Sequence, residues 1–242
     1  MKQLTILIAV TLLMTTPTYS QKEKFKSLFN EKDLSGWIVK GKSDDVAKNY
    51  WTTADGIIQC NSVGDTAHDY VWLMTKNEYA NFHLKLKFAA FKKSKGNSGV
   101  QFHSRYDDEA YWLDGPQVDI HTPKPFRCGL VWDETRENKR WIYPDVEGGY
   151  VRPKPEWQKA KAPFYYHSND SALWNEMEII VKDFHVTTIL NGVQVTDFDG
   201  KEILSDEIHK KYGVSGKGHI CLQLHKKAQL KIWFKDLYIK EL

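Results

Sequence analysis

Three stretches of the sequence carry glutamine, histidine or charged residues at every second position, which is the spacing of one face of a β-strand. These polar positions are Gln101, His103 and Arg105; Gln117, Asp119 and His121; and Gln223 and His225. An exposed sheet face is ordinarily rich in Lys, Glu and Thr, so this composition favours a polar cleft. We therefore expect one site formed by three strands, and the alternative is an ordinary exposed sheet face.

A further charged group follows the apolar segment 129–132 at an expected strand end. Glu134 is suited to act as an acid or base, and Arg136 is suited to hold a substrate oxygen. The alternative is a surface ion pair, which is usually worth about 0–1 kcal/mol.

Other chemistries lack their motifs. The chain has no Gly-rich phosphate loop, no His-Glu-x-x-His and no Gly-x-Ser-x-Gly. No cofactor is indicated with certainty, but four residues could bind a divalent metal ion, although without a fixed-spacing motif: His103, Asp119, His121 and Glu134. The 34 basic and 31 acidic residues are interspersed, so the electrostatic footprint of a nucleic-acid-binding protein is missing.

The elements that must position these residues are strands. Period-two alternation recurs, most clearly over 82–88, and Asn191-Gly192 is a strong hairpin signal between 186–190 and 193–195. Many short strands separated by turn residues predict an all-β sandwich or barrel. Two stretches break the pattern: a Pro- and aromatic-rich segment, 136–163, expected to be a loop over one sheet face, and 199–218, with one short helix around 202–211.

The N-terminus resembles a secretory signal peptide, with Lys2, an apolar run over 4–14 and small residues up to Ser20. We expect a signal peptide over 1–20, a single domain over 21–242, no membrane span after cleavage, and a secreted or periplasmic protein without a lipid anchor. The three cysteines allow neither a disulfide scaffold nor a four-cysteine zinc site, and their apolar neighbours predict buried thiols.

Several motifs, taken in order, resemble the 3-keto-disaccharide hydrolase family, which is common among exported bacterial proteins. The resemblance covers about 25–242. The motifs that carry it are Phe29-Asn30, Leu34–Trp37, Gly96–Phe102, Gly115–Ile120, Gly129–Glu134, Trp174–Glu176, Leu190–Val193, Leu222–His225 and Phe234–Leu237.

The resemblance implies a concanavalin A-like β-sandwich (jelly roll) of two curved antiparallel sheets with the site on the concave face, and a carbohydrate substrate whose ring carries a ketone at carbon 3. On that basis Asp119 or Glu134 is expected to act as base, and His225 or the other carboxylate as acid. His103, Arg105 or a metal ion would stabilise an enolate. Sugar contacts are expected from Gln101, Gln117, Gln223, Arg136, His121, Trp112, Trp132 and Trp141. A non-catalytic carbohydrate-binding module and an ordinary glycoside hydrolase of the same fold remain alternatives.

Overall fold

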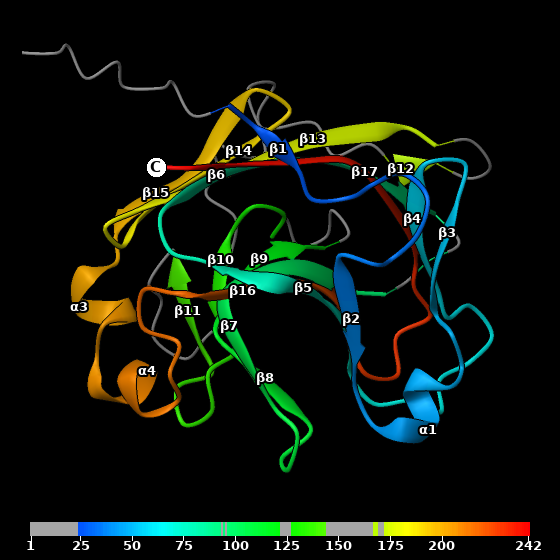
Figure 1. The fold of residues 1–242 in the computed structure, drawn as a ribbon, viewed down its shortest axis with the longest axis horizontal. Coiled ribbons are helices and arrows are strands. Elements are labelled where there is room, and N and C mark those ends of the chain that lie inside the picture. Colours follow the sequence, from blue (N-terminus) through cyan, green and yellow to red (C-terminus); the bar gives the residue numbers. More distant parts are fainter. Residues whose placement is uncertain (1–23, 93, 95, 122–126, 144–166, 169–171) are drawn as a thin grey trace, which may run out of the picture.

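The computed structural model describes residues 24–92, 94, 96–121, 127–143, 167–168 and 172–242. Two curved sheets lie face to face (Figure 1). Strand neighbours are antiparallel except for β12 and β6. The back sheet has the order β15 (Val193–Asp199), β14 (His185–Leu190), β13 (Trp174–Lys182), β6 (Phe82–Phe91), β17 (Lys231–Glu241), β4 (Ile57–Asn61) and β3 (Trp51–Ala54), with β1 (Lys26–Ser27) on β17 and β12 (His167–Ser168) on β6.

The front sheet lies below the back sheet in the view of Figure 1. Its order is β11 (Arg140–Tyr143), β10 (Val131–Asp133), β9 (Pro116–Ile120), β7 (Ser98–Asp107), β16 (Gly218–Leu224), β5 (Val71–Tyr79) and β2 (Trp37–Lys40), with β8 (Trp112–Asp114) on β7. The helices of the described ranges are short and lie beside the front sheet: α1 (Ser43–Val46), α3 (Lys201–Leu204) and α4 (Glu207–Lys211). The prediction of an all-β sandwich of two antiparallel sheets is confirmed.

The core fills the space between the sheets and follows from period-two alternation. In β6, Leu84, Leu86 and Phe88 are buried in the core, whereas Lys85 and Lys87 alternate with them on the outer face. Burying one such side chain contributes about 1.5–3 kcal/mol. In the front sheet, Val118 and Ile120 of β9 are likewise buried in the core, so packing fixes the inner face and leaves the outer face free to carry polar residues.

The local predictions are confirmed with one correction. Asn191 and Gly192 join β14 to β15 with φ of 49° and 78°, as a type I′ turn requires. The single helix expected around 202–211 is instead two helices, because Asp206 interrupts the helix and caps α4 by accepting a hydrogen bond from the His209 N–H. 

The three cysteines are buried and unpaired. The expected signal peptide and most of the expected loop over 136–163 lie outside the described residues. Among the residues that the structure describes, no helix is long and apolar enough to cross a membrane.

Candidate active site

A cleft of about 300 Å³ opens on the outer face of the front sheet, on the side away from the core. Strands β5, β8, β9, β10 and β11 and their flanking loops provide most of its lining. The lining residues are Tyr70, Asn97, Trp112, Gln117, Asp119, Arg127, Trp132, Glu134, Lys139, Trp141, His225 and Lys226.

The floor of the cleft depends on a residue without a side chain. Gly99 in β7 pairs with Asp119 in β9. A Cβ atom on Gly99 would come within 2.5 Å of Gln117 Cγ, so the Gln117 side chain lies over Gly99. From that place Gln117 Nε2 donates a hydrogen bond to Asp119 Oδ1 at 2.7 Å. The glycine thus makes room for the amide that orients Asp119.

Asp119 is the most strongly perturbed acid of the cleft. Only 3% of it is exposed, and burial raises its pKa from an ordinary 3.8 to about 7. The nearby charge of Glu134 raises the pKa further, whereas the Gln117 hydrogen bond and the charge of Arg127 lower it. A carboxyl group with a pKa near neutral pH is suited to act as a general base or acid.

Glu134 lies directly after β10, and its N–H donates to the Gly115 carbonyl at 3.1 Å. It is 8% exposed, and burial raises its pKa. The Gln223 amide, the charge of Lys139 and the Trp132 indole lie close enough to lower it. Two carboxyl groups therefore share the cleft, as the strand pattern predicts for Asp119 and the expected turn predicts for Glu134.

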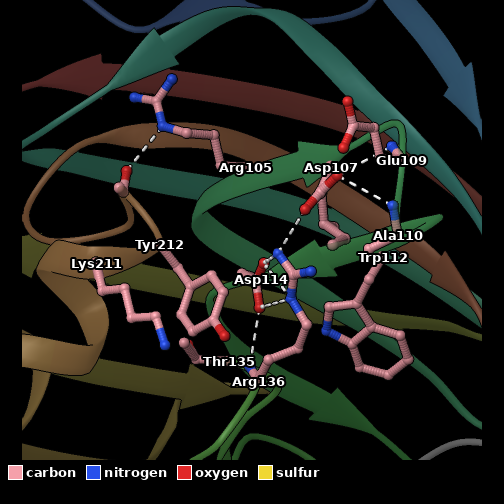
Figure 2. A network of polar contacts seen from close by, with 12 residues as sticks. Arg105, Asp107, Glu109, Ala110, Trp112, Asp114, Thr135, Arg136, Lys211 and Tyr212 are labelled. Atoms are coloured by element: carbon pink, nitrogen blue, oxygen red, sulfur yellow. Dashed lines mark hydrogen bonds and ion pairs between the residues drawn. The ribbon is translucent and has the colours of Figure 1, made fainter.

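Neighbouring residues hold the turn that carries Glu134, and Figure 2 shows the contacts that Arg136 makes within it. The Thr135 N–H donates to Asp133 Oδ1 at 3.0 Å, and the Arg136 N–H donates to Asp114 Oδ1 at 2.8 Å. The Arg136 guanidinium donates to the carboxylates of Asp114 and Asp107 at 2.7 and 2.9 Å. Arg136 is therefore engaged by protein carboxylates outside the cleft, which corrects the prediction that it holds a substrate oxygen.

A β-bulge explains why His103 and Arg105 are absent from the cleft. Ser104 and Gln101 of β7 pair with His219 and Cys221 of β16, so β7 has two residues between these pairs where β16 has one. One of the two, His103, has a φ of 48°. The extra residue breaks the alternation on which the prediction depended. His103 Nε2 lies 2.7 Å from the Ala80 carbonyl, and Arg105 donates to the Gly213 carbonyl and to Glu78. Neither residue lines the cleft, which corrects their expected catalytic roles.

The other two predicted glutamines lie under the cleft. Gln101 is fully buried, accepts a hydrogen bond from Trp72 Nε1 at 2.6 Å and donates to the Leu113 carbonyl at 3.4 Å. It does not line the cleft, so its predicted sugar contact is wrong. Gln223 is also fully buried beside Glu134, and neither of its amide atoms has a hydrogen-bond partner among the described residues.

His225 is paired with a tyrosine that the sequence pattern did not single out. Its Nδ1 lies 3.0 Å from the Lys226 carbonyl, which can only accept, so Nδ1 carries the hydrogen. Nε2 is then free to accept the Tyr70 O–H at 3.0 Å. Burial lowers the pKa of His225, and the charges of Lys226 and His121 lower it further. His121 is half-buried after the end of β9 and does not line the cleft.

The walls of the cleft are aromatic and its rim is cationic. Trp112 meets Tyr70 edge-on at 5.1 Å, and Trp132 meets Trp141 edge-on at 5.2 Å. Basic groups lie over three of these rings: Lys139 Nζ is 4.1 Å from the Trp112 ring, Arg127 Cζ is 5.4 Å from the Trp141 ring, and Lys226 Nζ is 5.6 Å from the Tyr70 ring.

Sequence reasoning missed five of the lining residues. Tyr70, which immediately precedes a strand, could have been found from its position; the other four stand in loops, where no periodicity marks them: Asn97, Arg127, Lys139 and Lys226.

Several buried polar atoms of the cleft lack a protein partner among the described residues. They are Asn97 Oδ1, Gln117 Oε1 and Arg127 Nε. Leaving buried polar atoms unpaired is unfavourable, so such a cluster is typical of a site that a ligand or water completes. Flat aromatic walls and amide groups are suited to a sugar.

The described residues offer few metal ligands at this site. Across the described ranges, no three His, Cys, Asp or Glu side chains gather closely enough to hold a metal ion. The expected four-residue set is not formed, because His103 is bonded to Ala80 and His121 does not line the cleft.

Comparison with known proteins shows relatives of the same fold. A protein of Parabacteroides distasonis, provisionally described as a glycosyl hydrolase, is 25% identical over 90% of this chain and 94% of its own, with a TM-score of 0.56. Two Bacillus subtilis proteins share the fold alone. One has a galectin-like fold (14% identity, 90% and 98% covered, TM-score 0.54), and the other is the carbohydrate-binding module CBM66 (10% identity, 85% and 96% covered, TM-score 0.50).

The comparison with functionally curated proteins gave no match. A family model described as a 3-keto-alpha-glucoside-1,2-lyase-like domain matches residues 24–240, so the resemblance found in the sequence is confirmed. The chain therefore belongs to the family of 3-keto-alpha-glucoside-1,2-lyase-like domains.

Proposed function

We propose that the protein cleaves glycosides whose sugar ring carries a ketone at carbon 3, by elimination followed by hydration. The observation that carries the proposal is Asp119, a buried carboxyl group with a pKa of about 7 in an aromatic-walled cleft. The family to which the chain belongs supports it, because that family is described by this type of substrate and by a 1,2-lyase reaction.

The ketone determines the route. It acidifies the hydrogen on carbon 2, which a base can remove to leave an enolate over carbons 2 and 3. The enolate re-forms the ketone as the bond between carbon 1 and the leaving oxygen breaks, and the leaving oxygen takes a proton. The product is an enone with a double bond between carbons 1 and 2. Water then adds to carbon 1, a proton returns to carbon 2, and the net reaction is hydrolysis.

The cleft supplies a group for each step. Asp119, deprotonated above a pH of about 7, is the proposed base at carbon 2. Arg127 and Lys139, which line the cleft, replace the expected His103 and Arg105 as candidates to stabilise the enolate oxygen. Glu134, whose pKa burial raises, is the proposed acid for the leaving oxygen.

Binding groups complete the proposed site. Gln117 is the proposed partner of a sugar hydroxyl, because it lines the cleft and its Oε1 has no hydrogen-bond partner among the described residues. Trp112, Trp132 and Trp141 provide the faces on which the ring stacks.

Turnover of 3-keto-trehalose and of plain trehalose, measured in D₂O, tests the proposal. Cleavage of the keto-sugar alone, with deuterium incorporated at carbon 2 of the product, is expected. Cleavage of plain trehalose without exchange at carbon 2 would instead indicate an ordinary glycosidase. Binding without cleavage of a panel of 3-keto-glycosides would indicate a binding module. Comparing turnover with and without a chelator tests whether a divalent ion takes part.

Matched variants test the roles of the carboxyl groups. Asp119→Asn should lower kcat by about 10²- to 10⁴-fold, the range for loss of a general base, and Glu134→Gln should lower it most for substrates with poor leaving groups. Asp108→Asn is the control, because Asp108 is exposed, pairs with Lys40 and does not line the cleft. Near-normal turnover by both cleft variants would overturn the assignment.

Export remains part of the proposal. Residues 1–20 should be removed as a signal peptide. Sequencing the N-terminus of the protein recovered from the periplasm or the medium should then give Gln21 as the first residue, and a chain that retains Lys2 would contradict it.

A further inference from the structure

A second hollow of about 440 Å³ adjoins the cleft. Lys226 lines both spaces. Adjacent residues of the chain also line the two spaces. Asp69 lines the hollow and Tyr70 lines the cleft, and His225, which lines the cleft, directly precedes Lys226. The cleft and the hollow therefore share a wall at Lys226, so a substrate longer than one sugar ring can reach from one to the other.

The acidic residues of the hollow are already occupied by protein groups. Asp69 accepts hydrogen bonds from the Tyr70 N–H at 2.9 Å and is paired with Lys42 Nζ at 2.9 Å. Asp45 accepts from the Asp69 N–H at 2.9 Å and has Lys48 Nζ at 3.5 Å. Their negative charge is balanced mainly by Lys42 and Lys48, and Lys226 adds a weaker electrostatic interaction with Asp69.

Two lysines of the hollow lack such partners. Within the described part of the chain, no carboxylate lies within 4 Å of Lys226 Nζ or Lys227 Nζ, and both residues are exposed. His68 lies between two main-chain carbonyl oxygens, with Nδ1 at 2.7 Å from Asp69 O and Nε2 at 3.1 Å from Ala228 O. Both ring nitrogens of His68 are therefore engaged by the main chain, and the free cationic groups of the hollow are the two ammonium groups of Lys226 and Lys227.

We propose that this hollow is a subsite for an oxyanion carried by the leaving group of the substrate. The proposal rests on the proposed function and narrows its substrate class to glycosides with an acidic leaving group, such as a uronate or a sulfated or phosphorylated sugar. An oxyanion gains both ion pairing and charge-assisted hydrogen bonds from the two ammonium groups, whereas a neutral sugar gains hydrogen bonds alone.

The test compares two 3-keto-disaccharides that differ only in the second sugar, glucose in one and glucuronate in the other, in both anomers. KM for the glucuronate compound should be about 3- to 10-fold lower, the range expected of one or two exposed ion pairs, and the difference should shrink in 0.5 M salt. Lys227→Asn should abolish the difference and leave the glucose compound unaffected. Asn is chosen because Lys227 has a φ of 58°. Lys240→Asn, in β17 of the back sheet, is the control.

Sulfate and phosphate esters of the second sugar distinguish the kind of oxyanion. Equal KM for neutral and acidic substrates, or a preference that survives Lys227→Asn, would overturn the subsite and leave the proposed function intact. If neither 3-keto compound is cleaved, the proposed function fails. Calorimetric titration of the same pair of compounds then decides the subsite separately, because tighter binding of the glucuronate compound, lost in Lys227→Asn, is required.

Discussion

Gly99→Ala should disable the site without touching a reacting group. The new Cβ would lie within 2.5 Å of Gln117 Cγ, so the Gln117 side chain must move and its 2.7 Å hydrogen bond to Asp119 must break. The backbone at Gly99 lies in a regular stretch of β7 paired with β9, so alanine adds no dihedral strain of its own. The effect should therefore arise at Asp119.

The expected size follows from that hydrogen bond. A hydrogen bond to a charged group is worth about 1.5–3 kcal/mol, and each pH unit of pKa corresponds to about 1.4 kcal/mol. Because the Gln117 amide lowers the pKa of Asp119, its loss should raise that pKa from about 7 by about one to two pH units. If Asp119 acts as the base, the acid limb of kcat/KM moves upward by the same amount. At pH 7 the rate should then fall by about 5- to 50-fold, and it should recover at higher pH.

The assay is the pH profile of kcat/KM on a 3-keto-glycoside. The control is Gly36→Ala, because a Cβ there meets only the Leu28 carbonyl at an ordinary 3.6 Å. In a Gln117→Ala background Gly99→Ala should add nothing further, since the side chain that it displaces is gone. An unshifted acid limb in Gly99→Ala, or effects of the two substitutions that simply add, would refute the reasoning.

Two further predictions concern the stability of the folded chain. The pKa of Asp119 is higher in the folded chain (about 7) than its ordinary 3.8, so the native state binds the extra proton and stability is lost as pH rises from about 4 through 7. In Asp119→Asn, the decrease in the free energy of unfolding between pH 4 and pH 8 should be smaller by about 2–4 kcal/mol than in the unchanged protein, as measured by urea unfolding. The same pH dependence in both proteins would contradict this prediction. Arg136→Ala leaves the carboxylate of Asp114, 2% exposed, without its ion pair and should cost about 2–4 kcal/mol by thermal unfolding. Arg105→Ala removes the exposed ion pair with Glu78 and should cost about 1 kcal/mol of stability or less. Equal losses of stability in Arg136→Ala and Arg105→Ala would contradict this account.

Strand alternation predicted the fold and part of the site for a simple reason. Where a strand is regular, burial of one face fixes the other, so Val118 and Ile120 in the core place Gln117 and Asp119 in the cleft. The same argument failed for His103, because a single extra residue in β7 interrupts the alternation and no sequence signal marks it.

Charge type alone misled at Arg136 and gave no indication of Arg127 and Lys139. Arg136 and Glu134 stand two residues apart in one turn, yet Arg136 is engaged by Asp114, a residue 22 positions away in sequence. Arg127 and Lys139 reach the cleft from loops, where side-chain direction depends on tertiary contacts and follows no period. Such residues can be found only once the strands that flank them are placed.

The turn after β10 separates folding from chemistry at the level of single residues. Asp133, Thr135 and Arg136 fasten the backbone, and Glu134 alone among the four lines the cleft. Replacement of Glu134 should therefore leave the scaffold standing. During evolution, residue 134 can therefore change to another acid, base or binding group while the fold is kept. A saturation library at residue 134 would test which of these side chains support a reaction.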